Sequence, residues 1–258
     1  MTKSHTIQPQ RIDIHRDFIS SLTRQEIYSL TLLSHIHNEI STLMRMLEHS
    51  FPKSEQTEIE RAGTFHMVQL FARLICGKIY EANEKIYQKH VQEFIKKWCI
   101  PYEIQQSIES LSTEFKKSFK QSKWLNRARN RHAMHYPRID EWAQALDFAG
   151  KYNFEIIVGS NKEELLFRTA DIAAFAAFSL EIDDTDILNG IEKMSQEIGP
   201  LALTLSRMTT QILGGFVQAS KSSNPKRSFA KHKEAKKFKA IEANSLEIPY
   251  FFYHKNRP

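Results

Sequence analysis

The chain has 258 residues, 41% of them hydrophobic and 26% charged, which is enough to bury one substantial core or two small ones. No apolar run approaches the 18 or more residues that a membrane span needs, and Met1–Gln10 lacks the apolar region of a secretory signal. Two cysteines, Cys76 and Cys99, are too few for a disulfide framework or a cysteine zinc site. We therefore expect no membrane association and a reducing, cytoplasmic location.

The formal net charge of +6 is concentrated near the C-terminus. Between Lys221 and Lys239 there are eight Lys or Arg residues against one Glu, and residues 240–258 are neutral, so residues 1–220 carry about −1. A protein that wraps duplex nucleic acid normally spreads cations over its folded face. This distribution favours a small catalytic cleft over a broad binding platform.

Most of the chain shows the three- and four-residue spacing of apolar side chains that is typical of amphipathic helices. The pattern predicts helices over Arg24–His49, Glu58–Trp98, Tyr102–Phe119, Ser122–Tyr136, Ile139–Ala149, Ala170–Leu180 and Asp186–Gln218. Pro137 ends the fourth helix, because proline restricts the preceding residue and cannot continue the hydrogen-bond ladder. Gly190, Gly199 and Pro200 are expected to divide the last one.

A single strand signal interrupts this helical pattern. Tyr152–Val158 and Glu164–Arg168 are rich in apolar and β-branched residues and flank Gly159–Lys162, which predicts a β-hairpin. From residue 219 to 247 the composition changes to Lys, Ser, Asn and Ala without an apolar period, which predicts a disordered basic arm. Ile248–His254 is a compact aromatic cluster that docks either on the body of the chain or on a partner.

The chemically distinctive stretch is Trp124–Pro137, which gathers three arginines and two histidines at the end of one predicted helix. A guanidinium keeps its charge at physiological pH and its planar fork fits phosphate oxygens, whereas an imidazole exchanges a proton near neutrality. Phosphoryl-transfer chemistry on RNA uses this combination, and it needs no metal. No glycine-rich phosphate loop, nucleophile elbow or dinucleotide fingerprint occurs elsewhere in the chain.

Within this stretch, Arg129, Asn130 and His135 resemble the Arg-x(4–6)-His signature of HEPN-family ribonucleases, in which Asn, Asp or His usually follows the arginine. Four Arg–His pairs in the chain have this spacing, and only Arg129 is followed by such a residue. The resemblance covers about residues 20–150 and, with the helical pattern, implies an all-α fold of HEPN type over residues 1–218. The residue pattern adds a small hairpin near 152–168 and a basic tail over 219–258. It also implies a bacterial toxin or phage-defence effector, which an antitoxin or other regulatory protein restrains.

The expected reaction is a metal-independent, cofactor-free cleavage of RNA by its own 2′-hydroxyl group. His135 would be the base and Arg129 would stabilise the phosphorane, while Asn130 would orient a catalytic group or bind the sugar. In an ideal helix, however, residues six apart differ by about 240° around the axis and about 9 Å along it. The resemblance suggests a homodimer in which the motif helices of both chains share one cleft.

Several neighbouring residues have two readings. His132 either tunes or replaces His135 or has a positioning role. Arg127 and Arg131 either bind flanking phosphates or solvate the helix. Tyr136 either stacks on a base or packs in the core. The arm residues expected to contact RNA are Lys226, Arg227, Lys231, Lys233, Lys236 and Lys237.

Two rival interpretations belong to other classes of protein. His35 with Glu39, or His132 with His135, has the spacing of a metal-ligand pair, but no third ligand has a fitting position. Arg73, Glu81 and Glu84 would either support the motif or form ordinary ion pairs. Alternatively, the chain is a non-catalytic helical module that binds RNA or a protein and uses Arg129 and His135 structurally, with His135 as a favourable cation at the helix end.

Overall fold

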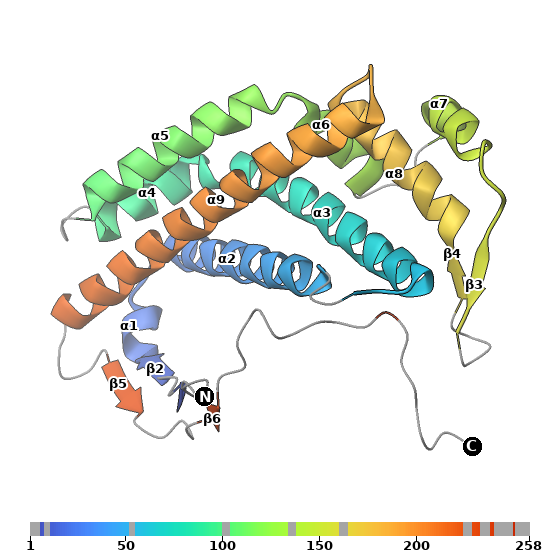
Figure 1. Ribbon diagram of the computed structural model, residues 1–258. Helices are drawn as coiled ribbons and strands as arrows, with labels where there is room; N and C mark the ends of the chain where they lie inside the picture. Colours follow the sequence, from blue (N-terminus) through green and yellow to red (C-terminus); the bar gives the residue numbers. More distant parts are fainter. Residues whose placement is uncertain are drawn as a thin grey trace. The chain divides into compact units, whose positions relative to one another are not determined.

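The computed structural model describes residues 6–7, 11–51, 55–99, 104–133, 138–159, 165–223, 229–232, 238–239 and 250. The prediction of an all-α fold with a small hairpin is confirmed (Figure 1). The helices are α1 (Arg16–Ser20), α2 (Arg24–Ser50), α3 (Glu58–Ile86), α4 (Lys89–Trp98), α5 (Gln105–Gln121), α6 (Trp124–Ala128), the π-helical turn η2 (Arg129–Ala133), α7 (Ile139–Ala149), α8 (Arg168–Ile182) and α9 (Ile187–Ser223). Within the described ranges, none of these helices has the length and hydropathy required to cross a bilayer.

The chain forms two compact units. Unit 1 comprises Met1–Glu39, Ala82–Lys116 and Thr204–Ser245, and unit 2 comprises Ile40–Glu81, Lys117–Leu203 and Leu246–Pro258. The division falls within α2, α3, α5 and α9, so each of these helices contributes residues to both units. The residues expected to form a separate tail after 218 are shared between them.

In unit 1, Glu26 in the first turn of α2 joins that helix to the end of α4. Its carboxylate accepts hydrogen bonds from the backbone N–H and the hydroxyl of Thr23, which together cap the helix. The same carboxylate accepts from Lys97 Nζ at 2.6 Å and Trp98 Nε1 at 2.9 Å. Beside this cluster, the rings of Phe18, Phe94, Trp98 and Phe216 pack together.

The prediction of one continuous helix over Glu58–Trp98 is wrong at one point, because α3 ends at Ile86 and α4 begins at Lys89. Gln88 adopts an extended backbone conformation, and Gln92 Nε2 donates to the Ile86 carbonyl at 2.8 Å. The change of direction lets α4 bury Val91 and Phe94. Burial of these side chains depends on tertiary packing, which the helical spacing alone does not report.

The expected division of the last helix is also wrong, since α9 runs unbroken from Ile187 to Ser223 with Pro200 inside it. Pro200 has no N–H group to donate to the carbonyl of Gln196. Because Gln196, Gly199 and Pro200 are all exposed, water can reach this part of the helix. Gly190 instead allows a close approach, because a Cβ atom there would collide with the Ser179 backbone of α8.

Unit 2 is built around α8, which contacts α6, α7 and strand β3 (Ile156–Val158). Small side chains make this packing close: Ala145 of α7 and Ala176 and Ala177 of α8 are buried together. The predicted hairpin is confirmed, because β3 pairs antiparallel with β4 (Leu165–Phe167) in the register Ile157↔Leu166. Its turn at residues 160–164 lies outside the described residues.

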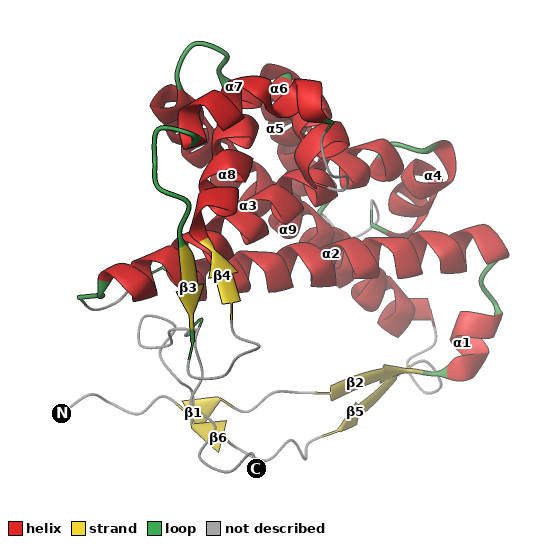
Figure 2. Ribbon diagram, turned by 90° about the vertical axis from the view of Figure 1, so that its right-hand side faces the viewer, coloured by secondary structure: helices red, strands yellow, loops and turns green. Residues whose placement is uncertain are grey.

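Other short strands pair residues from the two ends of the chain within unit 1. β2 (Arg11–Ile14) pairs with β5 (Phe229–His232), and β1 (Thr6–Ile7) pairs with β6 (Phe238–Lys239), both antiparallel (Figure 2). The prediction of one unbroken disordered arm over 219–247 is therefore wrong at these strands and at the end of α9. The pairing joins residues more than 200 positions apart, and a local composition signal cannot report it.

Of the C-terminal aromatic cluster, the structure describes Tyr250, which packs against other residues of the same chain. The Tyr250 ring meets that of His66 edge to face at 5.5 Å, and its Cβ lies 2.5 Å from the position that a Cβ on Gly63 would take. His66 Nδ1 in turn lies 2.9 Å from Asp171 Oδ1. At this residue, the structure agrees with docking on the body of the chain.

Glu26 makes the stability of unit 1 depend on pH. Burial alone would raise the pKa of its carboxyl, but the hydrogen bonds from Lys97, Thr23 and Trp98 lower it from 4.5 to about 2. The resulting stability is fully present above about pH 4.5 and is lost as the pH falls toward 2. We expect Glu26→Gln to reduce the free energy of unfolding at pH 7 by roughly 2–3 kcal/mol, measured by urea denaturation.

The matched control is Glu93→Gln, because Glu93 is a largely exposed carboxylate on α4 whose nearest cation, Lys89 Nζ, is 3.9 Å away. It should change the free energy of unfolding by less than about 0.5 kcal/mol. Equal effects of the two substitutions would contradict the role assigned to Glu26.

Candidate functional site

The basic stretch identified in the sequence lies in unit 2, on α6 and η2. Trp124, Leu125 and Ala128 are buried, and Trp124 Nε1 donates to Glu197 Oε2 of α9 at 2.7 Å. The Trp124 ring also meets that of Phe178 on α8. These contacts fix α6, and the chain then changes from α-helical to π-helical geometry at Arg129. Single π-helical turns are rare and occur frequently at functional sites.

Arg129 and Asn130, adjacent in the motif, are hydrogen-bonded to each other. Arg129 Nη1 donates to Asn130 Oδ1 at 2.8 Å, and Asn130 Nδ2 donates to Asn126 Oδ1 at 2.8 Å. Arg129 Nη2 lies 3.6 Å from Glu81 Oε1, beyond hydrogen-bond distance, and its guanidinium carbon lies 6.0 Å from the centre of the Tyr80 ring. The Arg129 side chain is 30% exposed.

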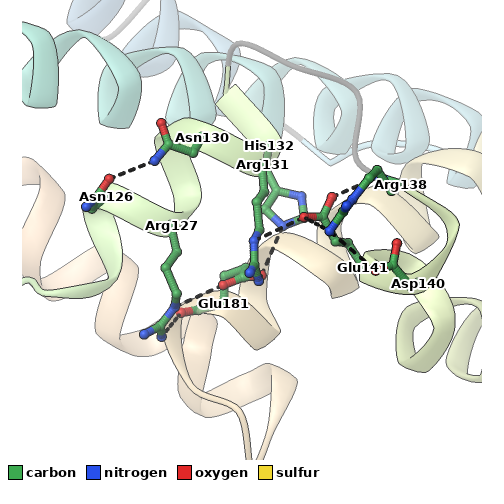
Figure 3. A network of polar contacts seen from close by, with 9 residues as sticks. All are labelled: Asn126, Arg127, Asn130, Arg131, His132, Arg138, Asp140, Glu141 and Glu181. Atoms are coloured by element: carbon green, nitrogen blue, oxygen red, sulfur yellow. Dashed lines mark hydrogen bonds and ion pairs between the residues drawn. The ribbon is translucent and has the colours of Figure 1, made fainter.

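Arg127 and Arg131 both bind one carboxylate, Glu181 near the end of α8 (Figure 3). Arg127 Nε donates to Glu181 Oε2 at 3.0 Å and its Nη2 donates to the Glu181 carbonyl at 2.8 Å. Arg131 Nη1 donates to Glu181 Oε1 at 2.6 Å. Although burial opposes ionisation of Glu181, these arginines lower its pKa below the ordinary value.

A second carboxylate, Glu141 in the first turn of α7, completes this network. Its Oε1 lies 3.2 Å from Arg131 Nε, and its Oε2 accepts from the backbone N–H of Arg138 at 2.8 Å. Hydrogen bonds and charge from Glu181, with the charge of Glu141, raise the pKa of Arg131. Glu141 therefore caps α7 and anchors the motif.

Sequence analysis missed both carboxylates. The spacing of Arg138 and Glu141 resembles that of a capping box and could have indicated the first of these contacts. Glu181 is 50 residues from Arg131, and its only local signal is an acidic residue at the end of an alanine-rich helix. That signal does not identify a partner.

His132 is buried on this network. Its side chain is 1% exposed, its ring meets Phe178 edge to face, and its Nε2 lies 3.8 Å from Glu181 Oε1, too far for a hydrogen bond. Burial lowers the pKa of His132, the positive charge of Arg73 reinforces this effect, and the negative charge of Glu181 opposes it. The imidazole is therefore biased toward its neutral form.

The other predicted site residues are described only in part. His135 and Tyr136 lie outside the described residues, as do Lys226, Arg227, Lys233, Lys236 and Lys237. Lys231 belongs to strand β5, where the structure describes its backbone. Among the described residues, the structure brings Arg127, Arg131 and His132 together around Glu181 and joins Arg129 to Asn130.

Of the residue pairs considered as metal ligands, His35 and Glu39 form an ordinary ion-pair contact, and His135 of the other pair lies outside the described residues. His35 Nε2 lies 3.4 Å from Glu39 Oε2, one turn further along α2. Across the described ranges, no group of three or more His, Cys, Asp or Glu side chains is arranged to hold a metal ion. Cys76 and Cys99 are both buried free thiols, and burial raises the pKa of Cys99 to about 12.

The environment of His132 predicts its titration. Its pKa should lie below 6.5, and Glu181→Gln should lower it further, because the substitution removes the negative charge that favours the imidazolium. NMR titration of the imidazole protons measures both values. Because the pKa is depressed in the folded state, the stabilisation it gives is present above about pH 6.5 and is lost as the pH falls through the folded value.

Glu192→Gln is the matched control, since Glu192 is an exposed carboxylate on α9 that accepts a hydrogen bond from Gln196. It should leave the pKa of His132 unchanged. A pKa of His132 that rises in Glu181→Gln would refute the electrostatic role given to Glu181.

Comparisons with known proteins gave no match: no protein-family model, curated protein or solved structure is similar to this chain. The interpretation of the site therefore rests on its residues and their geometry. The resemblance to HEPN ribonucleases is a hypothesis that depends on Arg129, Asn130 and His135.

Proposed function

We propose that this chain is a metal-independent endoribonuclease that cleaves RNA by 2′-hydroxyl transesterification. The observation that carries the proposal is the hydrogen bond by which Asn130, the next residue of the motif, holds the guanidinium of Arg129 in place. Arg127 and Arg131 each donate a hydrogen bond to a carboxylate, whereas the Glu81 carboxylate near Arg129 is 3.6 Å away. Arg129 is therefore the arginine of this turn best able to bind a phosphate.

The hydrogen-bonding capacity of Arg129 supports the same role. A guanidinium has five N–H donors, and the Arg129 Nε is buried without an acceptor. Unsatisfied donors of this kind often mark the place of a missing ligand or water. A phosphate diester would supply oxygen acceptors to the partly exposed Arg129 side chain and bring charge complementarity to its guanidinium.

In the proposed reaction His135 removes the proton of the 2′-hydroxyl group. The 2′-oxygen then forms a bond to phosphorus, the bond from phosphorus to the 5′-oxygen breaks, and the departing oxygen takes a proton from water or a second imidazole. The products are a 2′,3′-cyclic phosphate and a 5′-hydroxyl group. Arg129 stabilises the phosphorane, and Tyr136 stacks on a neighbouring base. In a homodimer, motif residues of both chains would share the cleft.

The surrounding charges suggest how substrate reaches this site. Residues 1–220 carry a net charge near −1, so long-range attraction of RNA comes from the cations of the basic tail. The resemblance extends the proposal to a cytoplasmic toxin or phage-defence effector, restrained by an antitoxin or another regulatory protein.

A second function is favoured by one observation. Glu181 neutralises Arg127 and Arg131, and the neighbouring His132 is buried. Both features are expected of a motif that only stabilises a helical module. Such a module would bind RNA or a protein without cleaving either. Activity of point variants distinguishes the two proposals.

We expect His135→Ala to reduce the rate of RNA cleavage in EDTA by about 10²- to 10⁴-fold, because general acid–base catalysis contributes that much. Arg129→Ala should cost at least about 10²-fold, since it removes the cation at the developing charge. Cleavage of a short fluorescent RNA measures both rates, and circular dichroism confirms that the variants are folded.

His35→Ala and Arg207→Ala are the controls, because both residues are exposed and lie outside the motif. They should keep the wild-type rate. Full activity of His135→Ala would remove this residue from catalysis, and a folded wild-type chain that binds RNA without cleaving it would favour the non-catalytic module.

The tail should set the salt dependence of RNA binding. Replacing Lys233, Lys236 and Lys237 by Gln should reduce the slope of log affinity against log salt by about 0.7 for each lost contact with single-stranded RNA. The matched control replaces Lys85, Lys89 and Lys96, three exposed lysines of α3 and α4. Fluorescence anisotropy at several salt concentrations measures the slopes, and equal slopes for the two triple variants would contradict RNA binding by the tail.

A further inference from the structure

Asn126, which lies outside the Arg-x(4–6)-His motif, is joined to it by two hydrogen bonds in series. Arg129 Nη1 donates to Asn130 Oδ1, and Asn130 Nδ2 donates to Asn126 Oδ1, both at 2.8 Å. Figure 3 shows the bond between the two amides, which lies apart from the contacts around Glu181. We call Arg129, Asn130 and Asn126 the amide relay.

The guanidinium of Arg129 fixes the direction of the amide relay. It has N–H donors and no acceptor, so the amide oxygen of Asn130 faces Arg129 and the Asn130 NH₂ group faces away from it. This NH₂ group in turn requires the oxygen of Asn126 as its acceptor. The NH₂ group of Asn126 therefore forms the outer end of the relay.

The outer end of the amide relay is an available donor. Asn126 is exposed, and within the described ranges its Nδ2 atom has no acceptor. Hydrogen bonds in series polarise one another, so a relay that begins at a cation strengthens the N–H groups at its far end. Such a donor is matched to an anionic oxygen, because hydrogen bonds to charged groups are stronger than those between neutral groups.

The charges near the amide relay favour an anion as the ligand. Glu181, the carboxylate of the neighbouring network, is largely buried and already accepts hydrogen bonds from two arginines. Glu81 lies 3.6 Å from Arg129 Nη2, whereas the relay starts at Nη1. Neither amide of the relay is bonded to a carboxylate of the described part of the chain.

We propose that the NH₂ group of Asn126 donates to a phosphate oxygen of RNA, on the phosphate next to the one that Arg129 binds. Asn side chains contact nucleic-acid phosphates, and such contacts fix the register of the strand. Two hydrogen bonds separate Asn126 from the guanidinium, a longer reach than one phosphate group spans, so the neighbouring phosphate is the acceptor. This assignment rests on the proposed function, since Arg129 places the first phosphate.

A DNA octamer that contains a single ribonucleotide tests the proposal, because a 2′-hydroxyl group can cleave only the linkage that follows it. A neutral methylphosphonate is placed in the linkage on one side or the other of the cleaved one. At one of these two positions it should lower kcat/KM of the wild type by about tenfold. Asn126→Ala should lower kcat/KM on the unmodified strand by about the same factor and should abolish the sensitivity to that linkage, because both changes remove one contact.

Asn126→Asp separates substrate binding from a structural role. Its carboxylate still accepts the hydrogen bond from Asn130, but it presents an anionic oxygen where Asn126 presents a donor. We expect kcat/KM on the unmodified strand to fall by more than about tenfold, and the methylphosphonate at the sensitive position to restore part of the loss. If Asn126 only held the relay in place, Asn126→Asp would keep the wild-type kcat/KM.

Gln121→Glu is the matched control, because Gln121 is an exposed amide at the end of α5 and its substitution adds the same charge outside the relay. This variant should keep the wild-type sensitivity to the neutral linkages. Equal cleavage of all three strands by the wild type, or wild-type kcat/KM for Asn126→Asp, would overturn the proposal and leave the proposed function intact. A folded wild-type chain that cleaves no RNA would overturn both.

Discussion

The carboxylate of Glu181 is the interaction on which the candidate site depends. Arg127, Arg131 and His132 lie within six residues of one another, and together they would place three basic groups on a short helical segment. Glu181 accepts hydrogen bonds from both arginines and lies close to the histidine. Its side chain is 12% exposed, whereas those of Arg127 and Arg131 are 54% and 43% exposed, so the buried carboxylate depends on the two arginines for its hydrogen bonds.

This arrangement divides the basic residues of the motif into two groups. Two arginines and the buried histidine hold the π-helical turn against α8, and Glu141 extends the same contacts to α7. Arg129 belongs to the other group, because its closest polar partner is the neutral amide of Asn130. A site that binds an anion needs both groups: a fixed framework, and a cation such as Arg129, whose hydrogen bond goes to a neutral amide and whose ion pair with Glu81 is long, at 3.6 Å.

Local sequence patterns predicted the parts of the fold that depend on local interactions. Arg24–Ser50 and Ile139–Ala149 agree with prediction to within one residue, because an uninterrupted apolar stripe defines the first and Pro137 and Gly150 delimit the second. The break at Gln88, the continuity of α9 through Pro200 and the pairing of β2 with β5 depend on tertiary contacts. The sequence indicated Arg129 and Asn130 as a pair, but not the carboxylate that anchors their neighbours.

Analysis of the RNA ends produced in EDTA tests the proposed chemistry most directly. Transesterification by the 2′-hydroxyl group leaves a 2′,3′-cyclic phosphate and a 5′-hydroxyl group, which mass spectrometry of a short cleaved RNA identifies. The proposed function predicts these ends, and it predicts that an RNA with a single 2′-deoxynucleotide at the cleavage position stays intact. Cleavage that requires a divalent metal and leaves 5′-phosphate and 3′-hydroxyl ends would contradict it.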